Sequence, residues 1–246
     1  MIINTQTVKK SSGGNNNYSV LGGILDDNEL IYPSTKTPAG TVLVPSNNPA
    51  DYTKVDWLGS TTATNVIDTN IPMNTIGSGS IECEFSCDRT VPRGISGGFS
   101  PNAESYQFYC NETEIWSRWR SQTYKYANSD NNFHKIGASP TKLYVDNNVM
   151  NINESALTKT DTILLFARHN YMNISDYMIG KIKYLWTKNT NNQYTHNLLP
   201  CYHTTEGYRV YFDAVSMKAY YGGFNFEIPS DTSGEINLAE YLASLT

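Results

Sequence analysis

Two carboxylates in the segment SIECEFSC have a spacing that glycoside hydrolysis can use. Glu82 and Glu84 are two residues apart, so both side chains project from the same face of a β-strand. Retaining glycosidases use two carboxyl groups about 5–5.5 Å apart, one as acid and one as nucleophile. The same alternation turns Ile81, Cys83 and Phe85 to the opposite face, which is typical of an ordinary half-buried strand. We therefore predict no catalytic residue, and hydrolysis by Glu82 and Glu84 is the alternative.

An aromatic and basic segment, IWSRWRSQTYKY at residues 115–126, is the main candidate for ligand binding. Aromatic rings stack on sugar faces, and Trp, Tyr and Arg are frequent anchors of interfaces. On one continuous strand, Trp116, Arg118, Arg120 and Tyr124 share one face and Trp119 takes the other, so one of the two Trp residues is expected in the core. Ordinary sandwich packing is the competing interpretation. The candidate ligand-binding residues are Trp116, Arg118, Trp119, Arg120, Tyr124 and Tyr126.

Other residues with catalytic or metal-binding chemistry lack the required spacing. The sequence contains no HxH or HExxH motif. The oxygen-rich triplets at residues 26–28, 130–132 and 146–148 consist of residues that turns favour. We therefore predict no metal site and no cofactor, and a structural role for His134. Four cysteines without zinc-knuckle spacing are expected to be buried reduced thiols: Cys83, Cys87, Cys110 and Cys201.

The elements that must position these side chains are predicted to be strands. The chain has 246 residues, of which 18 are tyrosines, and it is 39% hydrophobic and 17% charged. Tyr, Thr, Val and Ile favour strands, and Asn, Gly, Asp and Ser favour turns. Strand-like runs separated by turn signals recur from residue 52 onward, as a β-sandwich requires. A hairpin is predicted around residues 146–148, and a short helix with Ser233 as its N-cap near residues 233–245.

The charge balance and hydropathy exclude two classes of partner. The net charge is −5 and the pI is about 5.4, whereas nucleic-acid binders usually have a basic surface and a high pI. No segment approaches the roughly 20 apolar residues of a membrane-spanning helix. The first residues do not resemble a secretory signal, so synthesis in a cytoplasm is expected. We predict no nucleic-acid partner and no membrane insertion.

Five segments resemble concanavalin-A-like, laminin-G-type domains of tailed-phage virion accessory proteins, in order and in spacing. They are VDWLGSTTATNVIDTNI (55–71), FHKIGASPTKLYVDNN (133–148), LLFARHN (164–170), GKIKYLW (180–186) and NLLPCYHTTEGYRVYFDAVSMKAYY (197–221). The last segment is the most specific. The resemblance covers residues 51–226 and implies an all-β fold, a two-sheet antiparallel jelly-roll β-sandwich. The expected organisation is an extended N-terminal attachment arm at 1–50, the sandwich at 51–228 and a short C-terminal helical tail at 229–246.

The resemblance also implies a setting. The expected protein is a non-enzymatic virion component, either a head fibre or a capsid decoration, assembled in the bacterial host cytoplasm. It would show its sandwich to host or mucosal glycans for weak adhesion, and would bind capsid or tail proteins. A tail receptor-binding protein and a glycan hydrolase remain the alternatives. Because the fold hosts many functions, the ligand must be argued from a site.

Two further sets of residues are predicted to make contacts with other chains. A polar arm that contains a few apolar and basic residues can become ordered when it binds a capsid or tail partner. The candidate attachment residues are Ile2, Ile3, Val8, Lys9 and Lys10. An apolar stripe along the C-terminal helix either covers an edge of the sandwich or contacts a second copy in a homo-oligomer. The candidate oligomer contacts are Leu238, Tyr241, Leu242 and Leu245.

Overall fold

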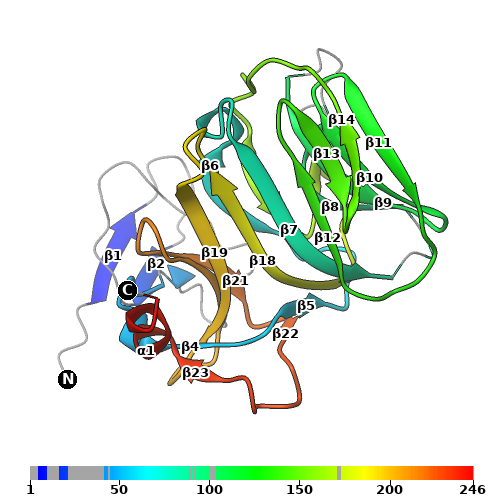
Figure 1. Cartoon of the computed structure of the whole chain (residues 1–246). Helices are drawn as coiled ribbons and strands as arrows, with labels where there is room; N and C mark the ends of the chain where they lie inside the picture. Colours follow the sequence, from blue (N-terminus) through cyan, green and yellow to red (C-terminus); the bar gives the residue numbers. More distant parts are fainter. Residues whose placement is uncertain are drawn as a thin grey trace.

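Two packed β-sheets form the body of the protein, as predicted (Figure 1). The computed structural model describes residues 5–9, 17–21, 42–43, 45–88, 90, 92–99, 104–170 and 173–245. The first three of these ranges are described as backbone strands only. The fold is a jelly-roll β-sandwich with a short C-terminal helix, and its strand pairs are antiparallel except for β2–β3 and β8–β16.

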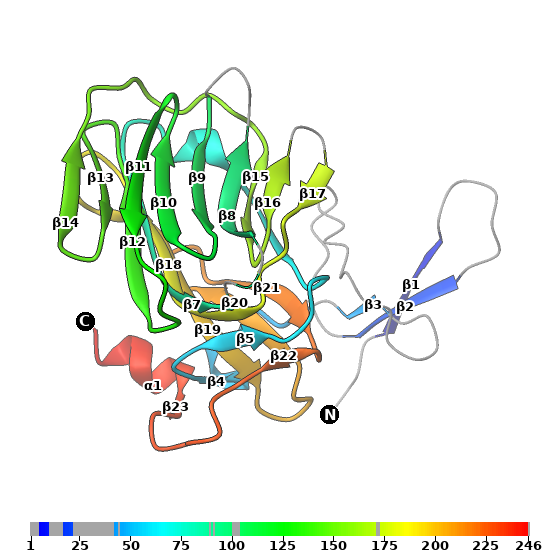
Figure 2. The ribbon, with the colours of Figure 1, turned by 90° about the vertical axis from the view of Figure 1, so that its right-hand side faces the viewer.

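The eight-stranded sheet has the order β11-β10-β9-β8-β15-β6, and β16 and β17 are attached at β8 (Figure 2). Its strands are β6 (Ile67–Pro72), β8 (Arg93–Phe99), β9 (Tyr106–Cys110), β10 (Glu114–Trp119), β11 (Gln122–Ala127), β15 (Thr162–Leu165), β16 (Arg168–Asn170) and β17 (Asn173–Ser175). Consecutive strands β8 to β11 are joined as hairpins. This part of the sheet therefore follows directly from chain order.

The twelve-stranded sheet has the central order β14-β13-β12-β7-β18-β19-β20-β21, and the short strands β4, β5, β22 and β23 pair at its side. Its strands are β4 (Tyr52–Lys54), β5 (Leu58–Ser60), β7 (Ser80–Cys87), β12 (His134–Ala138), β13 (Lys142–Val145), β14 (Asn148–Asn151), β18 (Gly180–Lys188), β19 (Tyr194–His203), β20 (Arg209–Asp213), β21 (Lys218–Gly223), β22 (Phe226–Glu227) and β23 (Ile236–Asn237). The predicted hairpin at 146–148 is confirmed, because β13 and β14 meet at Asp146, which adopts φ 53°.

The main core lies between the two sheets, and strand alternation builds it. Along β7, every second residue is buried, so that Ile81, Cys83 and Phe85 face the other sheet. From the eight-stranded sheet, Tyr106, Phe108 and Trp119 complete the same cluster. Each fully buried aliphatic or aromatic side chain stabilises the fold by about 1.5–3 kcal/mol relative to exposure.

Two of the four cysteines differ from the prediction of reduced thiols. Cys87 at the end of β7 and Cys110 at the end of β9 form a disulfide that joins the two sheets. Cys83 and Cys201 are buried free thiols, and burial raises the pKa of both. The sequence could not pair Cys87 with Cys110, because their proximity depends on the packing of one sheet on the other.

The C-terminal helix α1 (Leu238–Ala243) begins later than predicted, with Asn237 as its N-cap instead of Ser233. The Asn237 side chain accepts a hydrogen bond from the backbone N–H of Ala239. The chain stays extended up to this point because Ile236 and Asn237 pair with β4. Leu238 is fully buried in a second apolar cluster with residues of β4 and of β19 to β21.

The segment before the sandwich contains a small separate sheet of β1 (Thr5–Lys9), β2 (Asn17–Leu21) and β3 (Val42–Leu43). Of the candidate attachment residues, Val8 and Lys9 lie in β1, while Ile2, Ile3 and Lys10 lie outside the described residues. Residues 45–50 belong to the predicted arm but contact the sandwich. The Asn47 side chain accepts a hydrogen bond from the Ala219 N–H, and the 3₁₀ turn Pro49–Asp51 contacts α1.

Candidate functional site

The outer face of the eight-stranded sheet carries a row of aromatic and cationic side chains across four strands. Trp116 on β10 is in register with Lys125 on β11 and with Tyr109 on β9. The Lys125 ammonium lies 4.1 Å from the Trp116 ring centroid, and the Trp116 and Tyr109 ring centroids are 5.1 Å apart. Arg168 on β16 extends the row, with its guanidinium carbon 4.6 Å from the Tyr109 ring centroid.

Arg168 reaches Tyr109 because the position between them has no side chain. Gly94 on β8 is in register with Tyr109, and a Cβ atom at Gly94 would lie 2.7 Å from Arg168 Cγ. The Arg168 guanidinium is ion-paired with Asp176, which orients it. Phe166 adopts φ 66° after the end of β15, which redirects the chain so that β16 runs parallel to β8.

A second row lies beside the first. Gln107 on β9 is in register with Arg118 on β10, which pairs with Thr123 on β11. The Arg118 Nε donates a hydrogen bond to the Arg120 carbonyl oxygen at 2.6 Å. Burial and the nearby positive charge of Arg168 lower the pKa of Arg118. Gln107 is 3% exposed, and its Nε2 has no hydrogen-bond partner.

We call this surface the Trp116 face and define it by six residues. They are Gln107, Tyr109, Trp116, Arg118, Lys125 and Arg168. It combines two aromatic rings with several hydrogen-bond donors, and burial raises the pKa of the Tyr109 hydroxyl against the opposing effect of Arg168. Such a surface can contact the apolar face of a ring-shaped ligand and donate to its oxygen atoms.

Two of the six predicted ligand-binding residues, Trp116 and Arg118, lie on this face. Trp119 is fully buried in the core, and its Nε1 donates to the Ser155 carbonyl oxygen at 2.9 Å, so it is unavailable to a ligand. Tyr124 and Tyr126 are in register with the buried Ser117 and Ile115, and they pack on the core side of the sheet. These three placements correct the prediction.

The fourth correction, at Arg120, explains the placement of Tyr124 and Tyr126. Arg120 follows the end of β10, adopts φ 52° and forms a tight turn with Ser121. Residues 115–126 are therefore a hairpin, and the return strand reverses which parity faces outward. Arg120 itself is held at the sheet end, where it donates to the Ala156 carbonyl oxygen and pairs with Glu154. An Arg-Ser pair is not a typical hairpin turn, which favours Asn-Gly or Asp-Gly.

The carboxylates of the hydrolase alternative lie on the outer face of the other sheet. Glu82 accepts hydrogen bonds from the Tyr184 hydroxyl at 2.7 Å and from the Tyr144 hydroxyl. Glu84 accepts from the Lys183 ammonium at 2.7 Å. Burial, with Glu82 as the next cause, raises the pKa of both tyrosines. Both carboxylates thus serve as acceptors for neighbours in the same sheet.

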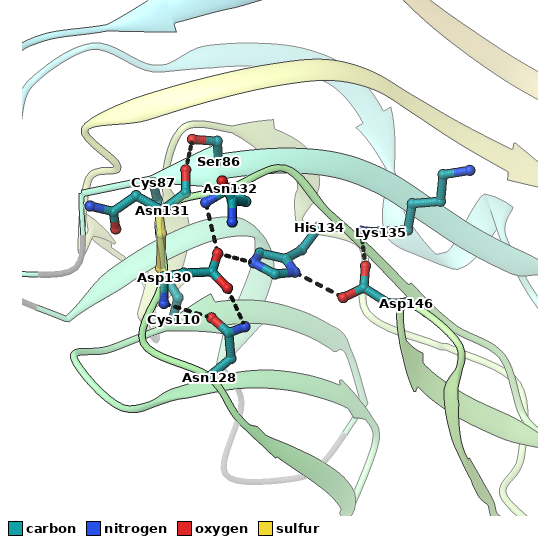
Figure 3. A network of polar contacts seen from close by, with 10 residues as sticks. All are labelled: Ser86, Cys87, Cys110, Asn128, Asp130, Asn131, Asn132, His134, Lys135 and Asp146. Carbon is teal, nitrogen blue, oxygen red and sulfur yellow. Dashed lines mark hydrogen bonds and ion pairs between the residues drawn. A yellow bond between two sulfur atoms is a disulfide. The ribbon is translucent and has the colours of Figure 1, made fainter.

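A polar cluster around His134 links two turns (Figure 3). The His134 Nε2 is 2.9 Å from Asp130 Oδ1, and its Nδ1 is 2.8 Å from Asp146 Oδ2. Asp130 lies between β11 and β12, and Asp146 lies between β13 and β14, so the ring ties two turns to β12. Hydrogen bonds from the Asn132 N–H, the Asn128 side chain and His134 lower the pKa of Asp130 to about 2.

The described residues include neither a group of metal ligands nor a membrane-spanning helix. Within the part of the chain that the structure describes, no three His, Cys, Asp or Glu side chains are grouped to hold a metal ion. In the same residues, no helix has the length and apolar character to cross a membrane.

Of the four candidate oligomer contacts, Leu238 is buried within its own chain. Tyr241 and Leu242 pack on the same apolar cluster as Leu238, whereas Leu245 is exposed.

Comparisons with known proteins give remote likenesses. No protein-family model and no curated protein matches this chain. Among solved structures, the Ruminococcus gnavus sialidase CBM40 is similar at 10% identity and a TM-score of 0.38, covering 49% of this chain and 83% of that one. The same module has been solved bound to α2,3-sialyllactose.

Two other similar structures come from animals. A heptameric SAP-like pentraxin from Limulus polyphemus matches at 8% identity and a TM-score of 0.34, covering 56% of this chain and 76% of that one. Domains LG4-5 of the mouse laminin α1 chain match at 11% identity and a TM-score of 0.38, covering 76% of this chain and 53% of that one. At these identities and TM-scores, the likenesses carry no argument about what this chain binds.

Proposed function

We propose that this chain is a non-enzymatic carbohydrate-binding protein whose ligand lies on the Trp116 face. The observation that carries the proposal is the in-register row of Lys125, Trp116, Tyr109 and Arg168 on neighbouring strands. Sugars offer apolar ring faces and hydroxyl oxygens, and this row offers aromatic surface and cationic donors side by side. Strand pairing holds these groups in place, which lowers the entropy lost on binding.

The absence of catalysis is part of this proposal. A retaining glycosidase needs one carboxyl group that donates a proton and one that attacks the sugar. Glu82 accepts two tyrosine hydrogen bonds and Glu84 is ion-paired with Lys183, which supports a role for both in holding the sheet. In the test, glycans are incubated with the wild-type chain and with Glu84→Gln. We expect no reducing sugar from either, and release that Glu84→Gln abolishes would establish the hydrolase.

Binding is tested with Trp116→Ala on a panel of immobilised glycans. Removal of an anchor aromatic costs about 2 kcal/mol or more, so the Kd should rise by about thirtyfold. Trp186→Ala is the matched control, because Trp186 also lies beside a lysine, Lys188, at 4.7 Å, but on the other sheet. Equal losses in both variants, or no glycan bound by the wild type, would exclude the Trp116 face as the binding site.

The setting on a virion is proposed from the sequence resemblance over residues 51–226. Many copies on a particle, either as head fibre or as decoration, would convert weak glycan contacts into useful avidity. A tail receptor-binding role is the alternative. The test mixes full-length chain, and a version lacking residues 1–30, with particles stripped of this protein, and counts bound copies. Binding of the full-length chain alone supports an attachment arm, and binding of neither contradicts the virion setting.

A further inference from the structure

We propose that the open edge of β14 is a homodimer interface, where two copies of this chain pair their β14 strands antiparallel about Met150. The inference concerns assembly and goes beyond the proposed function. β14 ends the twelve-stranded sheet, and among the residues that the structure describes it pairs with β13 alone. Figures 1 and 2 both show it on the side of the molecule away from β1, β2 and β3.

The bonds to β13 determine which backbone groups of β14 point outward. Just after β14, the Ile152 N–H donates to the carbonyl oxygen of Thr141, the residue opposite. In an antiparallel pair, opposite residues that exchange hydrogen bonds alternate with opposite residues that do not. Counting back from Ile152, the N–H and C=O groups of Val149 and Asn151 therefore point away from β13. They form the open edge of the sheet.

This edge lacks the features that normally prevent another strand from adding to a sheet. Proteins protect edge strands with lysine, with proline or with a covering segment. At the other three ends of the two main strand orders, β11 carries Lys125, β6 ends at Pro72, and the backbone of β21 bonds to Asn47. Residues 148–151 contain neither a charged residue nor a proline, and Val149 is 56% exposed. The β14 edge is thus open to strand pairing.

A second copy of the same strand matches the pattern of outward groups. With Met150 opposite Met150 of the other copy, each Val149 lies opposite an Asn151, and both of these residues have outward N–H and C=O groups. Each such pair exchanges two hydrogen bonds, so four backbone bonds join the copies. Identical strands also bring like residues close to the two-fold axis. Like charges there would be destabilising, and this strand has none.

The acidic residues at the two ends of β14 are engaged within their own chain. In this register, Asp146 of one copy comes opposite Glu154 of the other. Glu154 is paired with Arg120, and Asp146 contacts His134 and accepts a hydrogen bond from the Lys135 N–H. These partners offset part of the negative charge before a second copy approaches.

The C-terminal helix is the competing surface for a homo-oligomer. Of the contacts predicted there, Leu238, Tyr241 and Leu242 are used within their own chain, and Leu245 is the exposed one. β14 offers a continuous row of outward hydrogen-bonding groups instead. Strand pairing at this edge therefore explains a homo-oligomer better than the helix does.

The geometry of this pairing determines the form of the assembly. Because both copies use the same edge, the association closes at two. Residues directly opposite each other lie on one face of a sheet, so the two-fold axis is perpendicular to the sheet. The Trp116 faces of both copies then point to the same side of the dimer, where a multivalent ligand can contact both. The contact is smaller than the roughly 1,200–2,000 Å² of a stable interface, so we expect dissociation on dilution.

Sedimentation equilibrium of the purified full-length chain tests the association. The mass should rise with concentration from that of one chain toward that of two. Val149→Lys should raise the dissociation constant by about tenfold or more, because each new ammonium loses water at the contact. Val215→Lys is the matched control and should leave the constant unchanged. Val215 is a valine of similar exposure, 45%, in the turn between β20 and β21.

Cysteine cross-linking tests the register. Two cysteines at position 150 would face each other at the axis, with Cα atoms about 4.5 Å apart, within the range of a disulfide. Oxidised glutathione, which accepts the two electrons and two protons of the thiols, should convert Met150→Cys into a covalent dimer. Asn148→Cys should not cross-link, because its two copies are displaced by four residues along the strands. The native cysteines do not interfere, since all four are buried or bonded.

Several results would overturn the inference. One is a chain that stays monomeric up to about 1 mM. Another is an equal effect of Val149→Lys and Val215→Lys. Loss of the dimer in Leu245→Lys alone would assign the contact to α1. Masses above that of two chains would exclude a closed pair, and equal cross-linking of Asn148→Cys and Met150→Cys would exclude the register. No glycan takes part, so glycan binding by a monomer would leave the proposed function intact.

Discussion

The guanidinium carbon of Arg168 lies 4.6 Å from the ring centroid of Tyr109, although β8 separates their strands in the sheet. The contact passes over Gly94, and glycine is the residue type that has no side chain to stand between Arg168 and Tyr109. One glycine thus connects the aromatic row on the β9–β11 hairpins with an arginine that follows β15 much later in the chain. The composition of the Trp116 face depends on this crossing.

Substitution of Gly94 should therefore disturb both stability and binding. An alanine Cβ would lie 2.7 Å from Arg168 Cγ and 3.0 Å from the Asp176 carbonyl oxygen, so Arg168 must move. We expect Gly94→Ala to lower the free energy of unfolding by about 1–3 kcal/mol, measured by urea denaturation, and to weaken glycan binding. Gly98→Ala on the same strand should be milder, because its nearest atoms lie at 3.3 Å and one belongs to a methionine side chain. Equal costs at both positions would contradict this explanation.

Replacement of Gln107 should separate stability from function. Its buried Nε2 has no partner, and an unsatisfied buried donor costs about 1–3 kcal/mol. Gln107→Leu should consequently leave the free energy of unfolding unchanged or raise it, while glycan affinity falls. The same substitution at Gln193, which is exposed and bonded to Asn189, provides a control for surface leucine. A strongly destabilised Gln107→Leu protein would show that the amide has a structural role.

Acid should remove the contribution of the Asp130 carboxylate to the stability of the fold. Its folded pKa is about 2, below the ordinary value near 4, because hydrogen bonds from Asn132, Asn128 and His134 favour the carboxylate. Because the pKa of Asp130 is lower in the folded chain than in the unfolded chain, the ionised carboxylate stabilises the fold at every pH above about 4. That stabilisation is lost as the pH falls from about 4 to 2. Asp130→Asn should thus be less stable than wild type at pH 6 and approach it near pH 2. The exposed Glu112→Gln is the control, and a difference independent of pH would contradict the charge effect.

Thiol titration tests the link between the sheets. In denaturant without reductant, two of the four cysteines should react, and all four should react after reduction, because Cys87 and Cys110 are bonded. In the native state, Cys83 and Cys201 should stay unreactive, since burial keeps them as thiols. Replacing both bonded cysteines by serine should cost about 3 kcal/mol. Four reactive thiols before reduction would restore the prediction of reduced cysteines.

The alternation and turn signals were sufficient to predict the sandwich, the strand at 80–87 and the turn at Asp146. They also predicted that one of the two Trp residues of this segment lies in the core, and the structure shows that it is Trp119, which was among the candidate ligand-binding residues. The Arg120 turn was missed because its residues lack the usual turn chemistry, and Tyr124 was assigned to the wrong face as a result. Arg168 and Gln107 could not be found from sequence, since register across β8 and β9 brings them to the face.

The apolar cluster around Leu238 has a consequence for the order of events during synthesis. This cluster is completed by α1 and by β23, which pairs with β4, a strand made nearly two hundred residues earlier. A ribosome releases residues in order, so Tyr52 and the core residues of β19 to β21 emerge before the helix that covers them. Until residue 243 leaves the exit tunnel, this side of the sheet presents an uncovered apolar surface. The nascent chain therefore needs cover from a chaperone, or from a partner, in the interval between the emergence of β21 and that of α1.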